Sequence, residues 1–221
     1  MSVLDILITY HMAFLQGLSV TLKLCAVIWA TGLIGGVALG IVGAQHNRSW
    51  GRTVQWTSFA FSAIPTLVIL FWLHYPAQAM FDVVIDPFYT ASLTLSLVNL
   101  FGVGEIVRQA VNDFPRQYIV AGRVCGMRTR DIVRHIQLPI LFRQLLPSLL
   151  VLQVGMLHAS LFASLISVEE LFRVAQRINS IIYRPIEIYT ALALFFLAVC
   201  LPINLLAAWL KKRYTRDYSE R

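Results

Sequence analysis

The sequence predicts an all-α membrane protein with about five transmembrane helices, built as a single domain over residues 1–221. The chain is 58% hydrophobic and only 13% of its residues are charged, whereas about a quarter are charged in a typical soluble domain. Apolar runs near the roughly 20 residues needed to cross a bilayer recur along the chain. The three cysteines have no pairing pattern and no metal-ligand spacing, so neither a disulfide scaffold nor a metal site is expected.

Five segments are predicted to cross the membrane because each is long, mostly apolar and nearly free of charge. They are residues 18–45, 55–75, 87–108, 143–168 and 187–210. The third is the most polar, and its polar residues are Thr90, Ser92, Thr94, Ser96 and Asn99. We expect this span to face protein or water rather than lipid.

Glycines recur every four residues in the first span, at Gly32, Gly36 and Gly40. Such a stripe lets two helices approach closely. It could serve packing inside the chain, which we favour, or a seam between two copies.

The charges are sorted between alternate loops. Segments 46–53, 105–143 and 211–221 carry an excess of Arg and Lys, and segment 105–143 alone holds seven arginines against three acidic residues. The remaining loops are neutral or acidic. By the positive-inside rule, the N-terminus lies outside and the C-terminus in the cytoplasm. The net charge of +7 therefore indicates orientation, and no nucleic-acid partner is expected.

The cytoplasmic segment 115–139 is too polar to cross the membrane, but its apolar residues have helical spacing. The pattern predicts two short helices separated at Gly126, the second of which ends at Leu138-Pro139. The segment could lie on lipid headgroups, with its arginines on phosphates. It could instead dock a cytoplasmic partner, with apolar side chains in a groove and arginines around it.

The run Ala121-Gly122-Arg123-Val124-Cys125-Gly126-Met127, followed by Ile136-Gln137-Leu138-Pro139, resembles the "EAA" loop of ABC-importer permeases. Val120 stands where that family has Glu. The order of several weaker matches, among them Gly104-Glu105-Ile106-Val107-Arg108 and Glu170-Leu171, is similar to the polar-amino-acid branch of these permeases.

This resemblance implies the transmembrane domain of a type I ABC importer. It would be the permease subunit of an ATP-driven, binding-protein-dependent importer for a polar amino acid or related small zwitterion, working by alternating access in the bacterial inner membrane. The implied partners are two copies of a cytoplasmic ATPase, a second permease subunit, a periplasmic substrate-binding protein and membrane lipid. The chain would be no enzyme and bind no cofactor, since it has no Walker A pattern; ATP and magnesium would sit on the ATPase.

The resemblance also assigns sites. Its ATPase-coupling residues are Ala121, Gly122, Arg123, Gly126, Leu138 and Pro139. Ser62 stands where the branch usually has Arg, and Ala159 where it commonly has Asp. Together with Val120, these departures favour a second permease that is similar but distinct, although pairing with itself stays open.

Polar residues within the membrane are costly and therefore suggest function. The substrate-pathway candidates are Asn99, Gln153, His158, Ser160 and Glu105. Two have simpler interpretations, because Glu105 could pair with Arg108 one turn away and His158 could be hydrogen-bonded packing.

Outside, residues Glu169, Glu170, Arg173 and Arg177 form either a solvated helix surface or the docking surface for the binding protein.

A different class of function is an ion-coupled secondary transporter or small channel subunit. That class predicts an internal repeat and acidic residues deep in the spans. Neither is visible, because every acidic residue lies at or beyond the end of a predicted span.

Overall fold

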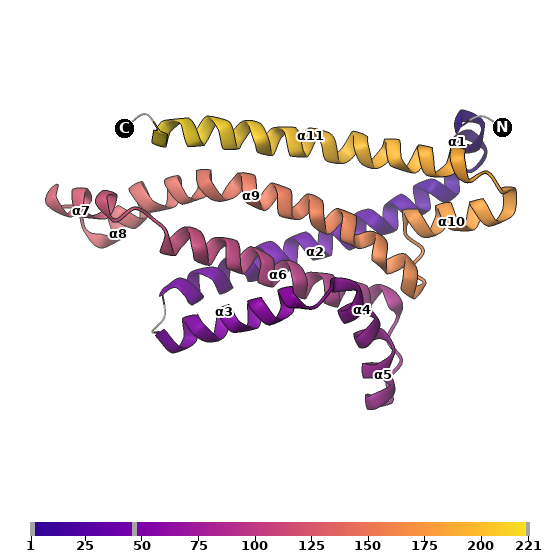
Figure 1. The fold of residues 1–221 in the computed structure, drawn as a ribbon, viewed down its shortest axis with the longest axis horizontal. Helices are drawn as coiled ribbons and strands as arrows, with labels where there is room; N and C mark the ends of the chain where they lie inside the picture. Colours follow the sequence, from indigo (N-terminus) through magenta and orange to yellow (C-terminus); the bar gives the residue numbers. More distant parts are fainter. Residues whose placement is uncertain (1–2, 46–47, 220–221) are drawn as a thin grey trace.

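The computed structural model describes residues 3–45 and 48–219, and all the regular secondary structure within these ranges is helical (Figure 1). In chain order the elements are α1 (Val3–Thr9), α2 (His11–Gln45), α3 (Arg48–Ala63), α4 (Thr66–His74), α5 (Pro76–Phe81), α6 (Pro87–Asn112), α7 (Arg116–Val124), α8 (Thr129–Ile132), the π-helical turn η1 (Val133–Gln137), α9 (Leu138–Ala159), the 3-10 segment η2 (Ser160–Ile166), α10 (Leu171–Ile182) and α11 (Pro185–Ser219). The predicted all-α fold class is confirmed.

Four helical stretches are long and apolar enough to cross a membrane: His11–Ala44, Pro87–Asn112, Thr129–Ile166 and Pro185–Tyr214. A fifth crossing exists if the two parts of a bent pair, Gly51–Ala63 and Thr66–Phe81, are taken together. The long helices lie side by side, with α1, α5 and α10 toward one end of the molecule and α7 and α8 at the other (Figure 1).

The second expected span, 55–75, is not one continuous helix. Its two parts meet at an angle of 89°. Pro65 lies between them in an extended conformation, with ψ of 131°. Helix α3 ends before Pro65 because proline has no N–H for the helical ladder and disfavours helix in the residue before it. The bend turns α4 and α5 away from the axis of α3 (Figure 1).

Helix α6 packs along α2 at the glycine stripe. A Cβ on Gly36 would lie 2.6 Å from Cβ of Val103, and one on Gly40 would lie 2.6 Å from the carbonyl oxygen of Gly104. Since a Cβ essentially never approaches a heavy atom within 3.0 Å, side chains at these positions would force the helices apart. The stripe therefore serves packing within the chain, the interpretation that we favoured.

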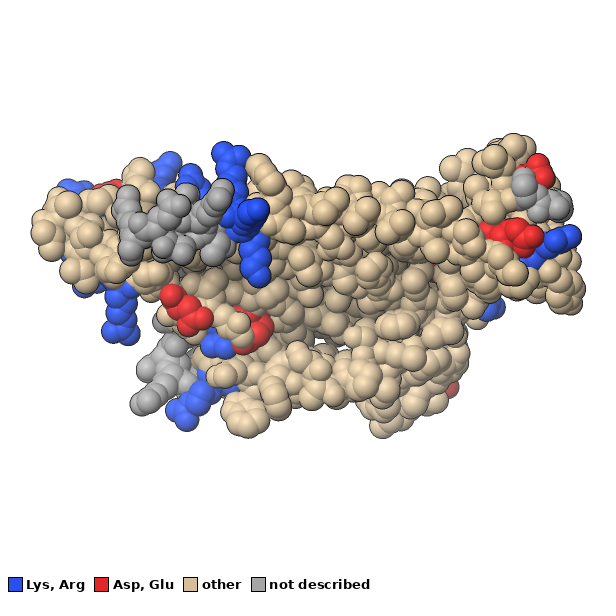
Figure 2. Space-filling view, turned by 45° about the horizontal axis from the view of Figure 1, so that its top comes forward, with Lys and Arg blue, Asp and Glu red and all other residues tan. Residues whose placement is uncertain are grey.

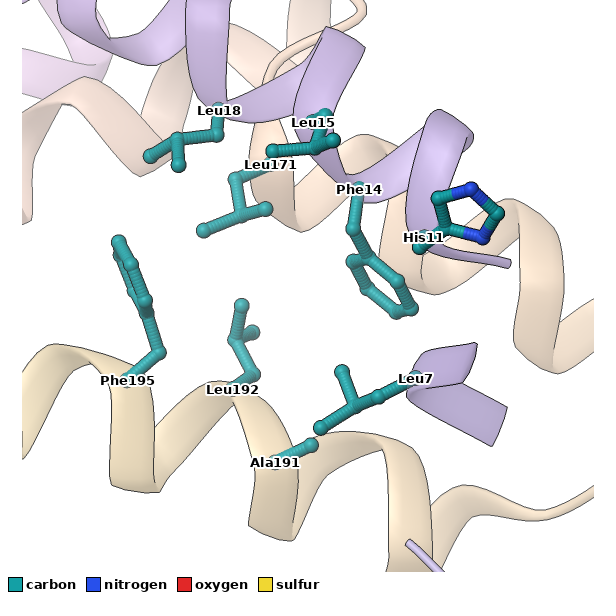
Figure 3. Close-up of a pocket in the computed structure, with 9 residues that line it drawn as sticks. All are labelled: Leu7, His11, Phe14, Leu15, Leu18, Leu171, Ala191, Leu192 and Phe195. Atoms are coloured by element: carbon teal, nitrogen blue, oxygen red, sulfur yellow. The ribbon is translucent and has the colours of Figure 1, made fainter. Parts of the chain in front are cut away.

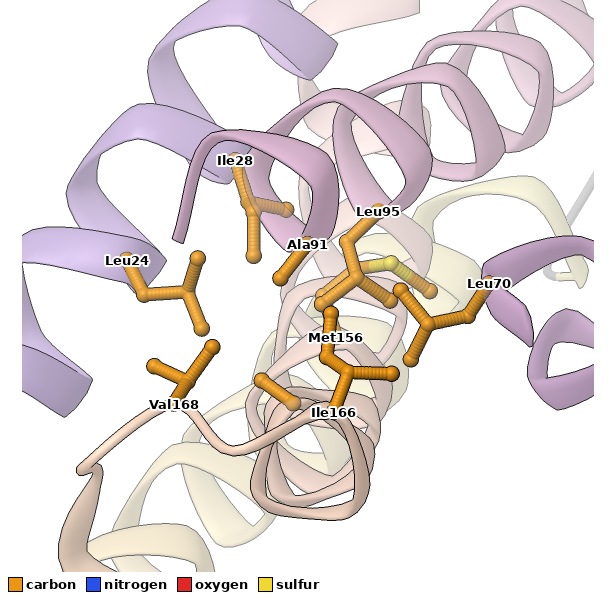
Figure 4. Close-up of a cluster of buried hydrophobic side chains, with 9 residues drawn as sticks. Leu24, Ile28, Leu70, Ala91, Leu95, Met156, Ile166 and Val168 are labelled. Carbon is orange, nitrogen blue, oxygen red and sulfur yellow. The ribbon is translucent and has the colours of Figure 1, made fainter. Parts of the chain in front are cut away.

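The largest apolar cluster joins α2, α4, α6, α9 and η2 (Figure 4). Its members are Leu24, Ile28, Leu70, Ala91, Leu95, Met156, Ala163, Ile166 and Val168. The cluster fixes the central helix α6 against its neighbours, and it buries Thr90, Ser92, Thr94 and Asn99 among them. The polar third span thus faces protein, as its composition indicated.

The predicted helix end at Leu138-Pro139 is wrong. Helix α8 continues through η1 into α9, and Pro139 lies in the first turn of α9. In the wider π-helical turn, the N–H of Leu138 bonds to the carbonyl of Val133. Such a turn accommodates a proline that has no N–H of its own, so the helix continues where an ordinary α-turn would break.

Candidate functional site

Segment 115–139 contains a small helical hairpin in which α7 packs on α8 and η1. Gly122 of α7 is buried at the contact, and a Cβ there would lie 2.9 Å from Cγ1 of Ile132 and 3.2 Å from Cδ1 of Ile136. Gly122 therefore permits a close approach between helices within the chain, and its assignment as an ATPase-coupling residue stays a prediction.

Gly126 ends α7. Its φ of +77° lies in the left-handed region, which glycine adopts without the penalty of a Cβ. The N–H of Gly126 bonds to the Arg123 carbonyl at 3.0 Å, and the N–H of Met127 bonds to the Gly122 carbonyl at 3.0 Å. These two bonds are a Schellman motif, which satisfies the last carbonyls of the helix. The break expected at Gly126 is therefore present, for the conformational reason that the sequence suggested.

The outer face of α7 presents apolar side chains to the surface. Val120 is 57% exposed and Val124 is 82% exposed, while Ala121 and Arg123 beside them are also exposed. We call these four residues the α7 face. Leu138 and Pro139 are exposed as well, at the start of α9.

Two of the five substrate-pathway candidates bind each other. The Asn99 amide donates to Gln153 Oε1 at 3.0 Å, and the Gln153 amide donates to Asn99 Oδ1 at 3.1 Å. Asn99 also donates to the Ile28 carbonyl at 2.9 Å. Both side chains are buried, so this pair ties α2, α6 and α9 together.

Two more candidates lie apart from that pair. Ser160 is buried and donates to the Leu157 carbonyl at 2.8 Å. His158 is exposed, and its ring lies 6.4 Å from the ring of Phe196 on α11. The structure therefore does not gather the five candidates around one cavity.

The fifth candidate, Glu105, forms the ion pair with Arg108 that its spacing of one helical turn predicted. Arg108 Nη2 lies 2.7 Å from Glu105 Oε1, and Arg108 Nε donates to Oε2 at 2.8 Å. Gln109 donates to Oε1 at 2.7 Å. The Glu105 side chain is still 29% exposed.

Glu105 borders a cleft between α3 and α6 of about 430 Å³. The residues that line it are Arg52, Gln55, Trp56, Ser58, Phe59, Ser62 and Glu105. The α3 wall of this cleft was not predicted. The signal for it in the sequence is a polar series at helical spacing inside an apolar segment: Arg52, Gln55, Ser58 and Ser62.

At the other end of the molecule, Glu170 caps α10. Its carboxylate accepts hydrogen bonds from the N–H groups of Phe172, at 2.9 Å, and Arg173, at 2.8 Å. The neighbouring Leu171 N–H donates to Thr21 Oγ1 on α2 at 3.0 Å. Burial raises the pKa of Glu170 to about 7, against the opposing effect of these hydrogen bonds.

The expectation that Glu170 docks a binding protein is wrong, because its side chain is fully buried. A negatively charged side chain at the N-terminus of a helix is stabilised by the helix dipole, and that signal could have identified its role. Glu169 and Arg177 remain half exposed and pair at 3.0 Å, and Arg173 is half-buried.

An apolar pocket of about 280 Å³ lies between α1, α2, α10 and α11 (Figure 3). Leu18, Leu171 and Phe195 line it, with His11 at its edge (Figure 3). His11 is the polar side chain of the lining, and its ring nitrogen is engaged with the Ile8 carbonyl at 2.7 Å. The pocket thus lacks the convergent polar groups that orient a solute. Within the described residues, no group of three or more His, Cys, Asp or Glu is placed to hold a metal ion.

Comparisons with known proteins agree with this architecture. Residues 36–216 match the family of binding-protein-dependent transport system inner membrane components. The glutamine transport system permease protein GlnP of Escherichia coli (strain K12) is 26% identical over 196 residues, which is 86% of this chain and 90% of that one. The L-cystine transport system permease protein TcyB of Bacillus subtilis (strain 168) is 31% identical over 188 residues, or 83% and 80% of the two chains.

The crystal structure of an amino acid ABC transporter with histidines has the same fold. It superposes with a TM-score of 0.84 at 23% identity, over 96% of this chain and 99% of that one. The architecture is that of a type I ABC importer transmembrane domain. The chain belongs to the family of binding-protein-dependent transport system inner membrane components, as an ABC-importer permease.

Proposed function

We propose that the chain is a permease subunit of an ATP-driven importer that carries a polar amino acid or related small zwitterion by alternating access. Relatives named for glutamine and for L-cystine support this substrate class, since both are polar amino acids. A periplasmic binding protein would deliver the substrate, and two ATPase subunits would bind the ATP and magnesium. A second permease completes the pathway, and the departures at Val120, Ser62 and Ala159 favour a similar but distinct chain for it.

The proposed orientation follows the charges. Lys and Arg side chains gather at the end of the molecule where α7 lies (Figure 2). Exposed arginines there include Arg116, Arg128, Arg130 and Arg134. We assign this end to the cytoplasm, which places α10 and the N-terminus outside. The half-exposed pair Glu169–Arg177 is then available to the binding protein.

The observation that carries the coupling role is the exposure of the α7 face. Val120 and Val124 are apolar and exposed, on a helix whose opposite side is fixed by the contact of Gly122 with Ile132. Exposed apolar side chains with a charged residue among them are typical of a helix that docks into a groove. A firmly seated helix can transmit movement of an ATPase to α9, because α8, η1 and α9 form one continuous helical stretch.

Copurification tests this role. We expect Val124→Glu to reduce ATPase recovered with the tagged permease about tenfold or more, because a charge would be buried in the docked groove. The matched control is Val84→Glu, since Val84 is 98% exposed and lies beyond α5, toward the opposite end. Equal ATPase recovery with both variants, in a folded permease, would contradict the coupling role.

A further inference from the structure

The apolar pocket between α1, α2, α10 and α11 has no part in the transport function proposed above. Its volume is about 280 Å³, and Phe14 and Leu18 of α2 face Leu192 and Phe195 of α11 across it (Figure 3). Every lining residue except His11 is apolar. Such a lining suits a hydrocarbon ligand. It does not suit water, which needs two to four polar partners.

The helices around the pocket are already in close contact. A Cβ on Gly17 of α2 would lie 2.8 Å from Cγ2 of Val174 on α10. Ile6 of α1 is only 1% exposed and packs in one apolar cluster with Ile188 and Leu192 of α11. The walls therefore cannot simply move together to fill the space. An empty cavity destabilises a protein in proportion to its volume, so a ligand that fills this one stabilises the arrangement.

The pocket opens onto an apolar surface. Among its lining residues, Leu7 is 37% exposed and Leu15 is 57% exposed. Other apolar side chains on the same helices are also exposed, Ile8 at 70% and Leu194 at 56%. Large apolar side chains at the surface of membrane-spanning helices face lipid. The opening is thus continuous with the lipid-facing surface of the chain.

The depth of the pocket can be measured along α11 from Lys211, the first charged residue at its inner end. Phe195 lies 16 residues before Lys211 and Ala191 lies 20 before it, which is about 24 and 30 Å along the helix. The hydrocarbon core is about 30 Å thick. In the proposed orientation the pocket therefore lies in the outermost part of the hydrocarbon core, beside the lipid headgroups.

His11 lies at the headgroup side of the pocket. It precedes Leu18 by seven residues of α2, which places it about 10 Å further outward. Its Nδ1 lies 2.7 Å from the Ile8 carbonyl oxygen, and a carbonyl only accepts, so Nδ1 carries the hydrogen. Nε2 has no hydrogen-bond partner among the described residues. An imidazolium there would donate to a phosphate, and a neutral imidazole would accept from a headgroup ammonium or hydroxyl.

We propose that this pocket binds one acyl chain of a glycerophospholipid from the outer leaflet, with the lipid headgroup beside His11. The lipid tail leaves one apolar environment for another, so its gain is dispersion contact with walls that would otherwise line a void. A binding protein approaches from the aqueous side, and Phe195 lies inside the hydrocarbon core, out of its reach. The bound lipid would fix α1 against α2 and α11, whatever solute the transporter carries.

Photoaffinity labelling tests the site in the complete transporter, reconstituted into vesicles that contain phosphatidylglycerol with a diazirine in the upper part of one acyl chain. We expect labelled peptides to include Phe14–Leu18 and Leu192–Phe195. Ala191→Phe should reduce this labelling about threefold or more, because a ring that fills a close-packed space excludes the ligand. The matched control is Ala193→Phe on the same helix. Ala193 is exposed and does not line the pocket, so the labelling should stay unchanged.

Equal labelling of the two variants would identify contact with bulk lipid and would overturn the proposal. No labelling of these peptides in the assembled transporter, with the ATPase still recovered, would assign the pocket to a protein partner and would also overturn it.

A second measurement is the thermal stability of the delipidated transporter in detergent. Adding phosphatidylglycerol should raise the unfolding temperature of the unaltered protein and of Ala193→Phe, because a ligand of the folded state stabilises it. Ala191→Phe should gain less, since its ring already fills the space. An equal gain in the two variants would count against the site.

The headgroup contact has its own test. His11→Ala should weaken the photolabelling, whereas Gln16→Ala should not, because Gln16 is exposed on the same helix but does not line the pocket. Unchanged labelling in His11→Ala would overturn the placement of the headgroup beside His11.

Discussion

Asn99 and Gln153 form a closed amide pair across the α6–α9 contact, with hydrogen bonds of 3.0 and 3.1 Å in the two directions. Gly32 of α2 lies directly against the Asn99 side chain, and Asn99 also donates to the Ile28 carbonyl. The pair therefore holds three membrane helices together. Two side chains that looked suited to a solute are satisfied by each other.

This relationship predicts non-additive effects of mutation. Asn99→Ala or Gln153→Ala alone leaves a buried amide without its partner and should cost about 1–3 kcal/mol of stability. The double variant leaves neither amide orphaned, so it should cost less than the sum, by about 0.6–2 kcal/mol. Unfolding of the four proteins in detergent gives the comparison, and strict additivity would show that the pair is not coupled.

The contact of Gly122 with Ile132 predicts that two adjacent residues of α7 respond differently. Gly122→Val should displace α7, because even a Cβ would lie 2.9 Å from Ile132, and amide exchange in Arg116–Val124 should accelerate. Ala121→Val adds similar bulk on the exposed side and should leave that exchange unchanged. Both variants should impair ATPase recovery, the first by moving the α7 face and the second by altering it. Equal exchange in the two variants would contradict the packing role of Gly122.

The sequence predicted the features of this fold that depend on composition and spacing. Apolar runs identify the spans, and the spacing of Gly32, Gly36 and Gly40 identifies a close helix contact. The π-helical turn before Pro139 was not predictable, because no residue type specifies that turn. Contacts between helices that are distant in sequence were not predictable either.

The same limit applies to the site residues. Gly122 could face outward or inward on α7, and only its contact with Ile132 decides between them. Glu170 resembled one of several surface charges, but its place against Thr21, 149 residues earlier in the chain, buries it. The α3–α6 cleft likewise needs two helices distant in sequence to exist.

Glu170 predicts a pH dependence in the attachment of α10 to α2. Its folded-state pKa is about 7, against 4.5 for the free side chain, so the docked helix binds the proton more tightly than the opened one. Docking should therefore be strongest below pH 4.5 and weaken as pH rises toward 7. Two charged residues lie beside Glu170. Glu169 also raises this pKa, and the backbone N–H of Arg173 donates to the carboxylate.

Hydrogen exchange in Leu171–Ile182 at pH 6 and pH 8.5, corrected for the intrinsic rate, measures this effect. Protection should be lower at pH 8.5, and Glu170→Gln should remove most of the difference. Greater protection at pH 8.5 in the unaltered protein would show that the sign is wrong.

The proposed transport is measured directly as amino-acid uptake by vesicles that contain this chain with its ATPase, its binding protein and its partner permease. We expect uptake to require ATP on the side of the membrane that carries the ATPase and the binding protein on the opposite side, and to be lost with Val124→Glu. Uptake driven by an ion gradient without ATP would contradict it, and would instead support a secondary transporter.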